Sequence, residues 1–269
     1  MCRSVNFVFS VGRYLARIGI SAPVGQPTIV LLGELQLAHL MHVPFENLHP
    51  YHRRNVRTDV DWSYPKIVES GRGGWCFELN GCFGELLRRI GFNVDYVSCQ
   101  VWEAEPGEWG PLNDHLALIV HIDGQRWFVD VGFGDCGLHP LQVVAGEVEA
   151  VPRRARIETH NGGFTLSESM PGGTGASVWE PQLRVGFEPK SNSDFDRRST
   201  YLQTEPGLSW TERAFATRAL DARGSRVTLR MDILRQRDGG GAFRDSPVAP
   251  DEWSEVLLRY FTLVDSNAR

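Results

Sequence analysis

Residues 72–80 read Arg72-Gly73-Gly74-Trp75-Cys76-Phe77-Glu78-Leu79-Asn80, so a cysteine follows two glycines and an aromatic residue. Glycine adopts backbone conformations that other residues avoid, and the pair favours a sharp turn before Cys76. A helical pattern starts at the cysteine, because apolar residues recur at three- and four-residue steps: Leu79, Cys82, Phe83, Leu86, Leu87 and Ile90. Gly91 is a typical helix end. The sequence therefore predicts a helix that begins near Cys76 and stops before Gly91.

Cys76 has two interpretations at this position. In the first turn of a helix, unpaired N–H groups and the positive end of the helix dipole favour a thiolate, and a nearby histidine would favour it further. Cys76 is then a candidate nucleophile. The alternative is a small core residue, since free cysteine is among the most buried residue types. The turn between glycines and helix start favours the nucleophile.

Composition narrows the classes of partner. The chain has 269 residues, 42% of them hydrophobic, which suits a globular protein with a large core and about two domains by length. The formal net charge of −5 gives no electrostatic signature of binding to nucleic acid or to an anionic membrane. No apolar run approaches the ~18 residues of a membrane helix. We expect small-molecule or protein partners, and a homo-oligomer is left open.

The cysteines argue against disulfides and zinc. Five is an odd number in a long chain, and no two of them form a C-x-x-C pair: Cys2, Cys76, Cys82, Cys99 and Cys136. The apolar stretch 5–11 is short, and no clear small-residue cleavage site follows it. We therefore expect reduced thiols, no metal site and a cytoplasmic location.

The first ~90 residues have mostly helical patterns. A short amphipathic helix is predicted over 12–19, a second helix over 28–41 and another helical turn or two over 61–69. A proline in Val43-Pro44-Phe45-Glu46-Asn47-Leu48 breaks the pattern after the second helix.

After Gly91 the pattern changes to the alternation of strands. One strand is predicted over 94–102, and a hairpin joins 115–122 to 125–131 through Asp123-Gly124, a strong turn signal. If Ile122 faces Gln125, paired residue numbers sum to 247. His115 and Asp130 then lie on one face of the sheet as diagonal neighbours.

This register supplies partners for Cys76. A thiol needs a base that takes its proton, and the imidazole needs a carboxylate that fixes its tautomer and stabilises its charge. His115 and Asp130 fit these roles, although each alone could be a strand-end or turn residue. Apolar neighbours of Asp130 argue for a buried carboxylate with a partner.

The sequence around Cys76, His115 and Asp130 resembles the arylamine N-acetyltransferases. Residues 72–81 match the family pattern R-G-G-(aromatic)-C-(aromatic)-E-x-N-G, and three further segments match in order and spacing: Tyr14-Leu15-Ala16-Arg17-Ile18-Gly19, Val43-Pro44-Phe45-Glu46-Asn47-Leu48 and Val129-Asp130-Val131-Gly132-Phe133-Gly134. The resemblance covers roughly residues 12–140.

The resemblance implies an α+β fold of three parts. These are a helical domain (1–90) with the nucleophile helix, a β-barrel-like domain (91–190) with the histidine and aspartate, and a smaller α/β lid domain (191–269). The family's catalytic residues fall on Cys76, His115 and Asp130, a cysteine-protease-like core. The implied reaction is a ping-pong acetyl transfer from acetyl-CoA, as a substrate and with no bound cofactor, to an arylamine, a hydrazine or an arylhydroxylamine.

The resemblance also suggests which residues contact substrates. The candidates are Phe45, Arg72, Phe133, Gly134 and Trp210. Arg72 could instead pair with Glu78 at the helix start. Where bacterial members usually have S-T-H-P-x-S-x-F, this chain has Glu205 in place of the histidine and Trp210 in place of the phenylalanine. Both changes alter the expected shape and polarity of the acceptor pocket.

Two other enzyme classes stay open. Macrolactam-forming amide synthases of ansamycin-type biosynthesis share the triad and the fold. A papain-like or transglutaminase-like cysteine hydrolase uses the same residue types in the same chain order.

Other motifs carry less weight. The match of 132–137 to G-x-G-x-x-G precedes a proline rather than a helix, which argues against dinucleotide binding. His39 and His42 are expected to be solvated or capping residues rather than metal ligands. A glycine-rich loop is expected at 171–175, a barrel strand at 182–187, a single strand at 227–234, a flexible linker at 239–241 and a final helix at 254–261.

Overall fold

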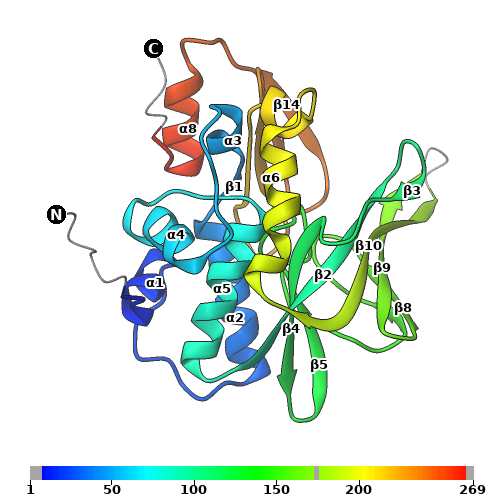
Figure 1. Ribbon diagram of the computed structural model, residues 1–269. Helices are drawn as coiled ribbons and strands as arrows, with labels where there is room; N and C mark the ends of the chain where they lie inside the picture. Colours follow the sequence, from blue (N-terminus) through cyan, green and yellow to red (C-terminus); the bar gives the residue numbers. More distant parts are fainter. Residues whose placement is uncertain (1–7, 173–175, 265–269) are drawn as a thin grey trace.

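The computed structural model describes residues 8–172 and 176–264, and it has the expected α+β architecture (Figure 1). The first part of the chain forms most of the helices, and the middle part forms a strongly curved sheet. The last part forms most of a second sheet and the final helix. The predicted fold class is confirmed. The division into 1–90, 91–190 and 191–269 stays a prediction.

The helical part surrounds the helix that begins at Cys76. Its elements are α1 (Val11–Arg17), α2 (Ile29–His42), α3 (Leu48–Tyr51), α4 (Val60–Tyr64), the π-helical turn η1 (Pro65–Glu69) and α5 (Cys76–Ile90). α5 begins at the predicted residue and ends at Gly91, whose φ of 112° is left-handed. It is buried along most of its length between the other helices and the curved sheet (Figure 1).

In the described part of the chain, nine strands form the curved sheet, in the order β6-β5-β4-β2-β10-β9-β8-β7 with β3 beside β2. They are β2 (Asn93–Glu103), β3 (Glu108–Trp109), β4 (His115–Ile122), β5 (Gln125–Val129), β6 (Leu141–Gln142), β7 (Gly146–Val148), β8 (Ala155–His160), β9 (Gly163–Pro171) and β10 (Ser177–Lys190). Its inner side encloses an apolar core around Phe128 and Phe164. The expected barrel strand 182–187 lies within β10. Gly173, Thr174 and Gly175 of the expected glycine-rich loop lie outside the described residues.

The predicted hairpin register is confirmed. Ile122 pairs with Gln125 and Leu118 with Val129, so the numbers sum to 247. Asp123 and Gly124 both have positive φ, 50° and 73°, as this two-residue turn requires. β5 ends at Val129, so Asp130 is the first residue beyond the strand.

The last part of the chain begins with η2 (Asn192–Phe195), α6 (Asp196–Thr204) and α7 (Ser209–Glu212). A second sheet has the order β1-β11-β12-β13-β14 and packs against α8 (Trp253–Phe261). Its strands are β1 (Phe45–Glu46), β11 (Phe215–Ala219), β12 (Arg226–Arg230), β13 (Ile233–Arg237) and β14 (Phe243–Pro247). Because β1 comes from the helical segment, the second sheet ties the two ends of the chain together.

Two expectations for this region are wrong. The single strand over 227–234 is a hairpin, because Met231 takes a φ of 47° and turns the chain between β12 and β13. Methionine gives no sequence signal for such a turn. The glycines at 239–241 are not a linker: they belong to the turn between β13 and β14, where Oδ1 of Asp238 accepts hydrogen bonds from the N–H groups of Gly240 and Ala242.

Candidate active site

The two glycines before Cys76 are required by close packing rather than by turn freedom. Neither has a left-handed φ. A Cβ on Gly73 would lie 2.1 Å from the carbonyl oxygen of Pro44, and one on Gly74 would lie 2.7 Å from Oε2 of Glu78. The loop that carries Cys76 therefore lies directly against the chain near β1, and the N–H of Glu46 donates to the carbonyl of Gly74 at 2.9 Å.

Buried ion pairs fix the loop that precedes Cys76. Nζ of Lys66 lies 2.8 Å from Oε1 of Glu78, whose other oxygen accepts a hydrogen bond from the N–H of Trp75 at 3.3 Å. Arg72 does not pair with Glu78, as one expectation had it: its Nη2 lies 3.2 Å from Oε1 of Glu46. The reason is that the buried Lys66 already occupies Glu78. Arg72 thus braces the loop against β1.

His115 and Asp130 come together as the register predicts, and Cys76 borders the same cavity as His115. Nε2 of His115 lies 2.7 Å from Oδ2 of Asp130, and both side chains are buried. The pKa of His115 responds to Cys76 as well as to Asp130, so the thiol lies close to the imidazole. Since Nε2 is taken by Asp130, Nδ1 is the nitrogen left for the thiol. Burial lowers the pKa of His115, but Asp130 and then Cys76 outweigh it and raise that pKa to about 10. The imidazole is therefore held in its charged form.

Asn80 is a site residue that sequence reasoning did not single out. Its Nδ2 donates to Oδ1 of Asp130 at 2.8 Å and to the carbonyl of Leu116 at 2.6 Å, and its Oδ1 accepts from the N–H of Val131 at 2.9 Å. Asn80 lies one helical turn after Cys76 on α5. The signal was present, because Asn80 closes the quoted stretch 72–80.

Gly132 must be a glycine for the site to close. A Cβ there would lie 2.8 Å from Cα of Cys76 and 2.7 Å from Nδ2 of Asn80. Its N–H also donates to Oδ1 of Asp130 at 2.8 Å. The next ring, that of Phe133, packs edge-on against His115 with a centroid separation of 5.3 Å. The loop after β5 thus covers the triad.

Cys76 and His115 border a cavity of about 420 Å³. Its lining consists of Phe45, Trp75, Cys76, Val101, Glu103, Asp114, His115, Gly132, Phe133, Arg198, Leu202, Leu208, Ser209 and Trp210. The volume lies in the range of small-molecule sites. Of the five expected substrate contacts, Phe45, Phe133 and Trp210 line this cavity. Arg72 and Gly134 are not part of the lining, and a Cβ on Gly134 would face Thr217 at 3.7 Å.

Trp210 completes an aromatic wall. It is half-buried on α7, and its ring lies edge-on to Trp75 at 6.1 Å and tilted against Phe45 at 5.9 Å. Nδ2 of Asn47 donates to the carbonyls of Trp210 and Arg213, at 2.9 and 2.8 Å. The short helix α7 is therefore fixed to the segment that follows β1.

The expectation that Glu205 changes the polarity of the pocket is not met. Glu205 is exposed at the end of α6 and is not among the lining residues. The carboxylates that do line the cavity are Glu103 and Asp114. Sequence reasoning missed them, because Glu103 ends β2 and Asp114 precedes β4, and only the pairing of these strands brings both residues to the cavity.

The remaining described cysteines are buried and differ from Cys76 in their surroundings. Cys82, Cys99 and Cys136 are free thiols, and burial raises the pKa of each. Sγ of Cys136 is directed at the carbonyl of Asp130, at 3.4 Å. None of the three lines the cavity, so among the described cysteines Cys76 is the one that a substrate there can reach.

The two histidines of α2, His39 and His42, differ in their exposure to solvent. His42 is exposed in the last turn, and its Nδ1 contacts the carbonyl of Ala38 at 2.8 Å, as expected of a helix-end residue. His39 is not solvated: it is fully buried, its Nδ1 lies 3.1 Å from the hydroxyl of Tyr14, and burial lowers its pKa to about 3. Among residues 8–172 and 176–264, no group of three or more possible metal ligands occurs, and no helix is long and apolar enough to span a membrane.

Comparison with known proteins identifies the family. The N-acetyltransferase family model matches residues 28–268. An arylamine N-acetyltransferase of Mycolicibacterium smegmatis is 32% identical over 203 residues, which are 73% of this chain and 72% of that protein. The solved structure of arylamine N-acetyltransferase from Salmonella typhimurium superposes with a TM-score of 0.87 at 26% identity, over 96% of this chain and 93% of that one. For the M. smegmatis structure the TM-score is 0.85 at 27% identity, with the same coverage of 96% and 93%.

Sequence, fold and family model agree over most of the chain. The match extends well beyond the segments around Cys76 and into the last sheet. This protein belongs to the arylamine N-acetyltransferase family.

Proposed function

We propose that this protein transfers an acetyl group from acetyl-CoA, through a thioester on Cys76, to the nitrogen of an arylamine or arylhydrazine. One observation carries the proposal. A buried Cys76–His115–Asp130 chain opens into an aromatic cavity of small-molecule size. Family membership supports the choice of acetyl-CoA as donor.

In the first half-reaction the Cys76 thiolate attacks the thioester carbon of acetyl-CoA. The carbon–sulfur bond to CoA breaks, and the CoA thiolate leaves with the proton of the His115 imidazolium. The N–H of Cys76 lies in the first turn of α5, where backbone donors lack helical partners, and this suits it to stabilise the developing oxyanion. The products are the acetyl-Cys76 thioester and CoA.

In the second half-reaction the amine nitrogen attacks the acetyl carbon. Neutral His115 accepts the proton of the amine, the bond to Sγ breaks, and Cys76 leaves as a thiolate that again faces an imidazolium. Asp130 holds the ring orientation in both steps and stabilises the charge of the imidazolium. The enzyme returns to its starting state.

We assign the acceptor to the aromatic wall of the cavity. Phe45, Phe133 and Trp210 offer apolar faces next to Cys76 that suit a flat aromatic amine. For Arg72 we propose a positioning role, because its partner is Glu46. Gly134 lies on the loop after β5 and faces β11, and we propose that this loop position contacts the substrate through its backbone.

The same chemistry bears on location and partners. A thiol nucleophile acts only while reduced, which supports a cytoplasmic location. The partners that the mechanism requires are acetyl-CoA and an acceptor amine. Neither half-reaction calls on nucleic acid or a membrane, and both can be completed within one chain.

The test is direct. The protein is incubated with acetyl-CoA, the acetyl mass gain is located by peptide mass spectrometry, and small arylamines and arylhydrazines are then added. We expect the label on Cys76, its absence from Cys76→Ser, and its transfer to the amine. CoA release that is equally fast without an amine would instead indicate a hydrolase. A stable acetyl-enzyme that no small amine discharges would favour an amide synthase.

A further inference from the structure

The active-site cavity has an unbalanced charge. Three charged side chains line it besides the triad: Glu103, Asp114 and Arg198. Asp114 and Arg198 neutralise one another, because Nη2 of Arg198 lies 2.7 Å from Oδ1 of Asp114 and both side chains are largely buried. Glu103, at the end of β2, has no ion-pair partner among the described residues. One carboxylate without an ion-pair partner therefore lines the cavity, on a residue that is also exposed to solvent.

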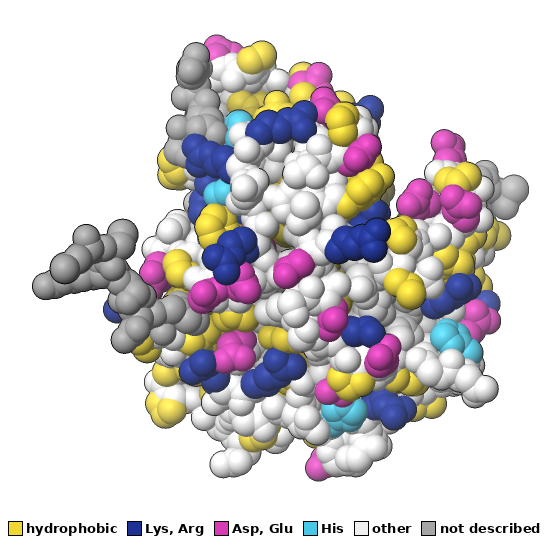
Figure 2. Space-filling view, in the orientation of Figure 1, with side chains coloured by type: hydrophobic (Ala, Val, Ile, Leu, Met, Phe, Trp, Pro, Cys, Tyr) yellow, Lys and Arg dark blue, Asp and Glu magenta, His cyan; other side chains and the backbone are white. Residues whose placement is uncertain are grey.

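Further acidic residues lie near Glu103. Glu108 lies opposite Glu103 in the register of β2 and β3, an arrangement in which like charges repel. The segment 103–114 contains Glu103, Glu105, Glu108 and Asp114 and no lysine or arginine. In Figure 2, acidic side chains gather over the end of the molecule that carries β3 in Figure 1.

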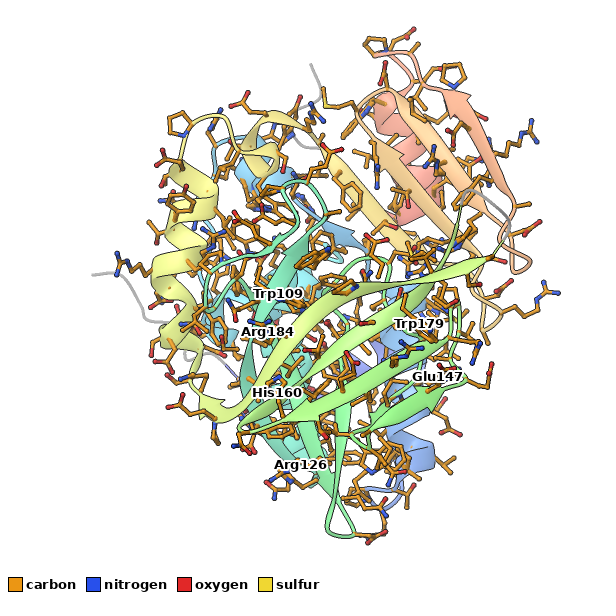
Figure 3. All side chains as sticks on the ribbon, turned by 90° about the vertical axis from the view of Figure 1, so that its right-hand side faces the viewer. Trp109, Arg126, Glu147, His160, Trp179 and Arg184 are labelled. Atoms are coloured by element: carbon orange, nitrogen blue, oxygen red, sulfur yellow. The ribbon has the colours of Figure 1, made fainter. Side chains whose placement is uncertain are left out.

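The nearest basic side chain on the neighbouring strand is engaged elsewhere. The guanidinium of Arg184, on β10, lies over the ring of Trp109 on β3, 4.5 Å from its centroid. Figure 3 labels both side chains side by side on this face. Arg184 thus contacts an aromatic ring and forms no ion pair with Glu103 among the described residues.

We propose that Glu103 is a specificity-determining residue for the acceptor. Its carboxylate favours arylamines that carry a cationic or hydrogen-bond-donating substituent, and it disfavours those that carry an anionic group. The proposal rests on the proposed function and names the acceptor class within it. The aromatic wall binds the ring, and Glu103 selects by the charge at the ring's far end.

Three acceptors of similar size separate charge from shape: 4-aminobenzoate (anionic), its methyl ester (neutral) and 4-aminophenyl-trimethylammonium (cationic). Each has a single nitrogen that can be acetylated. The rate constant kcat/KM is measured for the parent, for Glu103→Gln and for Glu108→Gln. Glu108 is the matched control, because it faces Glu103 across the strand pair but does not line the cavity.

In the parent we expect kcat/KM to fall in the order cationic, neutral, anionic. In Glu103→Gln the anionic-to-neutral ratio should rise about threefold to tenfold, and the cationic-to-neutral ratio should fall by a similar factor. Raising the ionic strength should shrink both changes. Ratios within one variant cancel any general loss of folded enzyme.

Unchanged ratios in Glu103→Gln, with the neutral ester still acetylated, would overturn this inference and leave the proposed function standing. Equal shifts in Glu103→Gln and Glu108→Gln would also overturn it, because a general surface field would then explain the selectivity. If the parent acetylates none of the three amines from acetyl-CoA, the proposed function itself fails and this inference fails with it.

Discussion

The side-chain amide of Asn80 lies 2.8 Å from Oδ1 of Asp130, the carboxylate whose other oxygen lies 2.7 Å from His115. Asn80 stands on the same helix as Cys76, one turn later. One helix therefore carries the candidate nucleophile and also holds the acid that orients its base. The same amide bonds Leu116 and Val131, so it ties α5 to both strands of the hairpin.

Asn80→Ala should disturb both folding and catalysis. It removes three buried hydrogen bonds and leaves Asp130 with an unmet acceptor site, so we expect the free energy of unfolding to drop by about 2–4 kcal/mol. Acyl transfer should slow, and the pH–rate profile should shift because Asp130 no longer holds His115 as firmly. Denaturant melts and pH profiles check this against Asn93→Ala, an exposed asparagine at the start of β2. Equal behaviour of the two variants would rule out the positioning role.

Gly132→Ala should inactivate the enzyme through a steric clash. The added methyl group would lie 2.8 Å from Cα of Cys76, which forces the loop after β5 away from the nucleophile. The control is Gly137→Ala in the same loop, where a Cβ meets nothing within 4 Å and φ is not left-handed. Acetylation rates and circular dichroism of both variants decide the matter. Full activity of Gly132→Ala would show that the loop can retreat without harm.

Alkylation should single out Cys76. It lines the cavity beside a charged imidazole, whereas burial raises the pKa of Cys82, Cys99 and Cys136. Iodoacetamide should therefore modify Cys76 first, as peptide mapping would reveal. A Cys2→Ala background avoids labelling at Cys2, which lies outside the described residues. Earlier modification of Cys82 or Cys99 would sink the assignment.

The pH dependence of stability should report the charge on His115. Its pKa is raised to about 10 from an ordinary 6.5, with Asp130 a larger contributor than Cys76. A raised pKa gives stability that is fully present below the unfolded value and is lost as pH rises towards the folded one. The free energy of unfolding should thus fall between about pH 6.5 and 10, by at most about 1.4 kcal/mol per pH unit.

The measurement is made in Cys76→Ser, which removes the thiol's own titration, and is compared with Cys76→Ser/Asp130→Asn. The carboxamide variant should lose most of this pH-dependent fall. Because that change could also weaken the fold, NMR titration of carbon-13-labelled histidine provides a second readout. A His115 resonance that titrates in the ordinary histidine range in the parent protein, where both Asp130 and Cys76 contribute, would refute the charge assignment.

The triad could be predicted because each part of it is encoded locally. The helix start places Cys76 in the first turn of α5, and the two-residue turn with strand alternation places His115 beside Asp130, since the hairpin sum of 247 holds in the structure. No local rule places Cys76 next to this pair; the family resemblance supplied that expectation. Local sequence rules predict the position of His115 relative to Asp130, because a two-residue turn allows only one strand register.

What local rules missed depends on packing between distant segments. Arg72 pairs with Glu46 rather than Glu78, because both carboxylate oxygens of Glu78 already accept hydrogen bonds from Lys66 of η1. Glu103 and Asp114, rather than Glu205, are the carboxylates that line the cavity, for the same kind of reason. Which side chains border a cavity is decided by how the sheet, α6 and α7 meet, and no spacing within one segment records that.

Trp210 forms one side of the aromatic wall of the cavity. Trp210→Phe keeps an aromatic face but removes part of its bulk. Small arylamines should remain substrates, while amines with bulky ring substituents should gain in the second half-reaction. The first half-reaction should change little, because the attack on acetyl-CoA depends on Cys76 and His115. Stopped-flow measurement separates the two steps.

A matched control for this variant is Trp179→Phe. Trp179 lies on β10 beside Arg156, on the outer face labelled in Figure 3, and it does not line the cavity. Both variants lose the same atoms, so only a cavity role predicts that acceptor size matters in one and not in the other.

The alternative is that Trp210 mainly supports the packing of Phe45 and Trp75. In that case both half-reactions would fall together with the melting temperature, whatever the size of the acceptor. A selective gain for bulky amines at an unchanged rate of Cys76 acetylation is the result that places Trp210 at the acceptor.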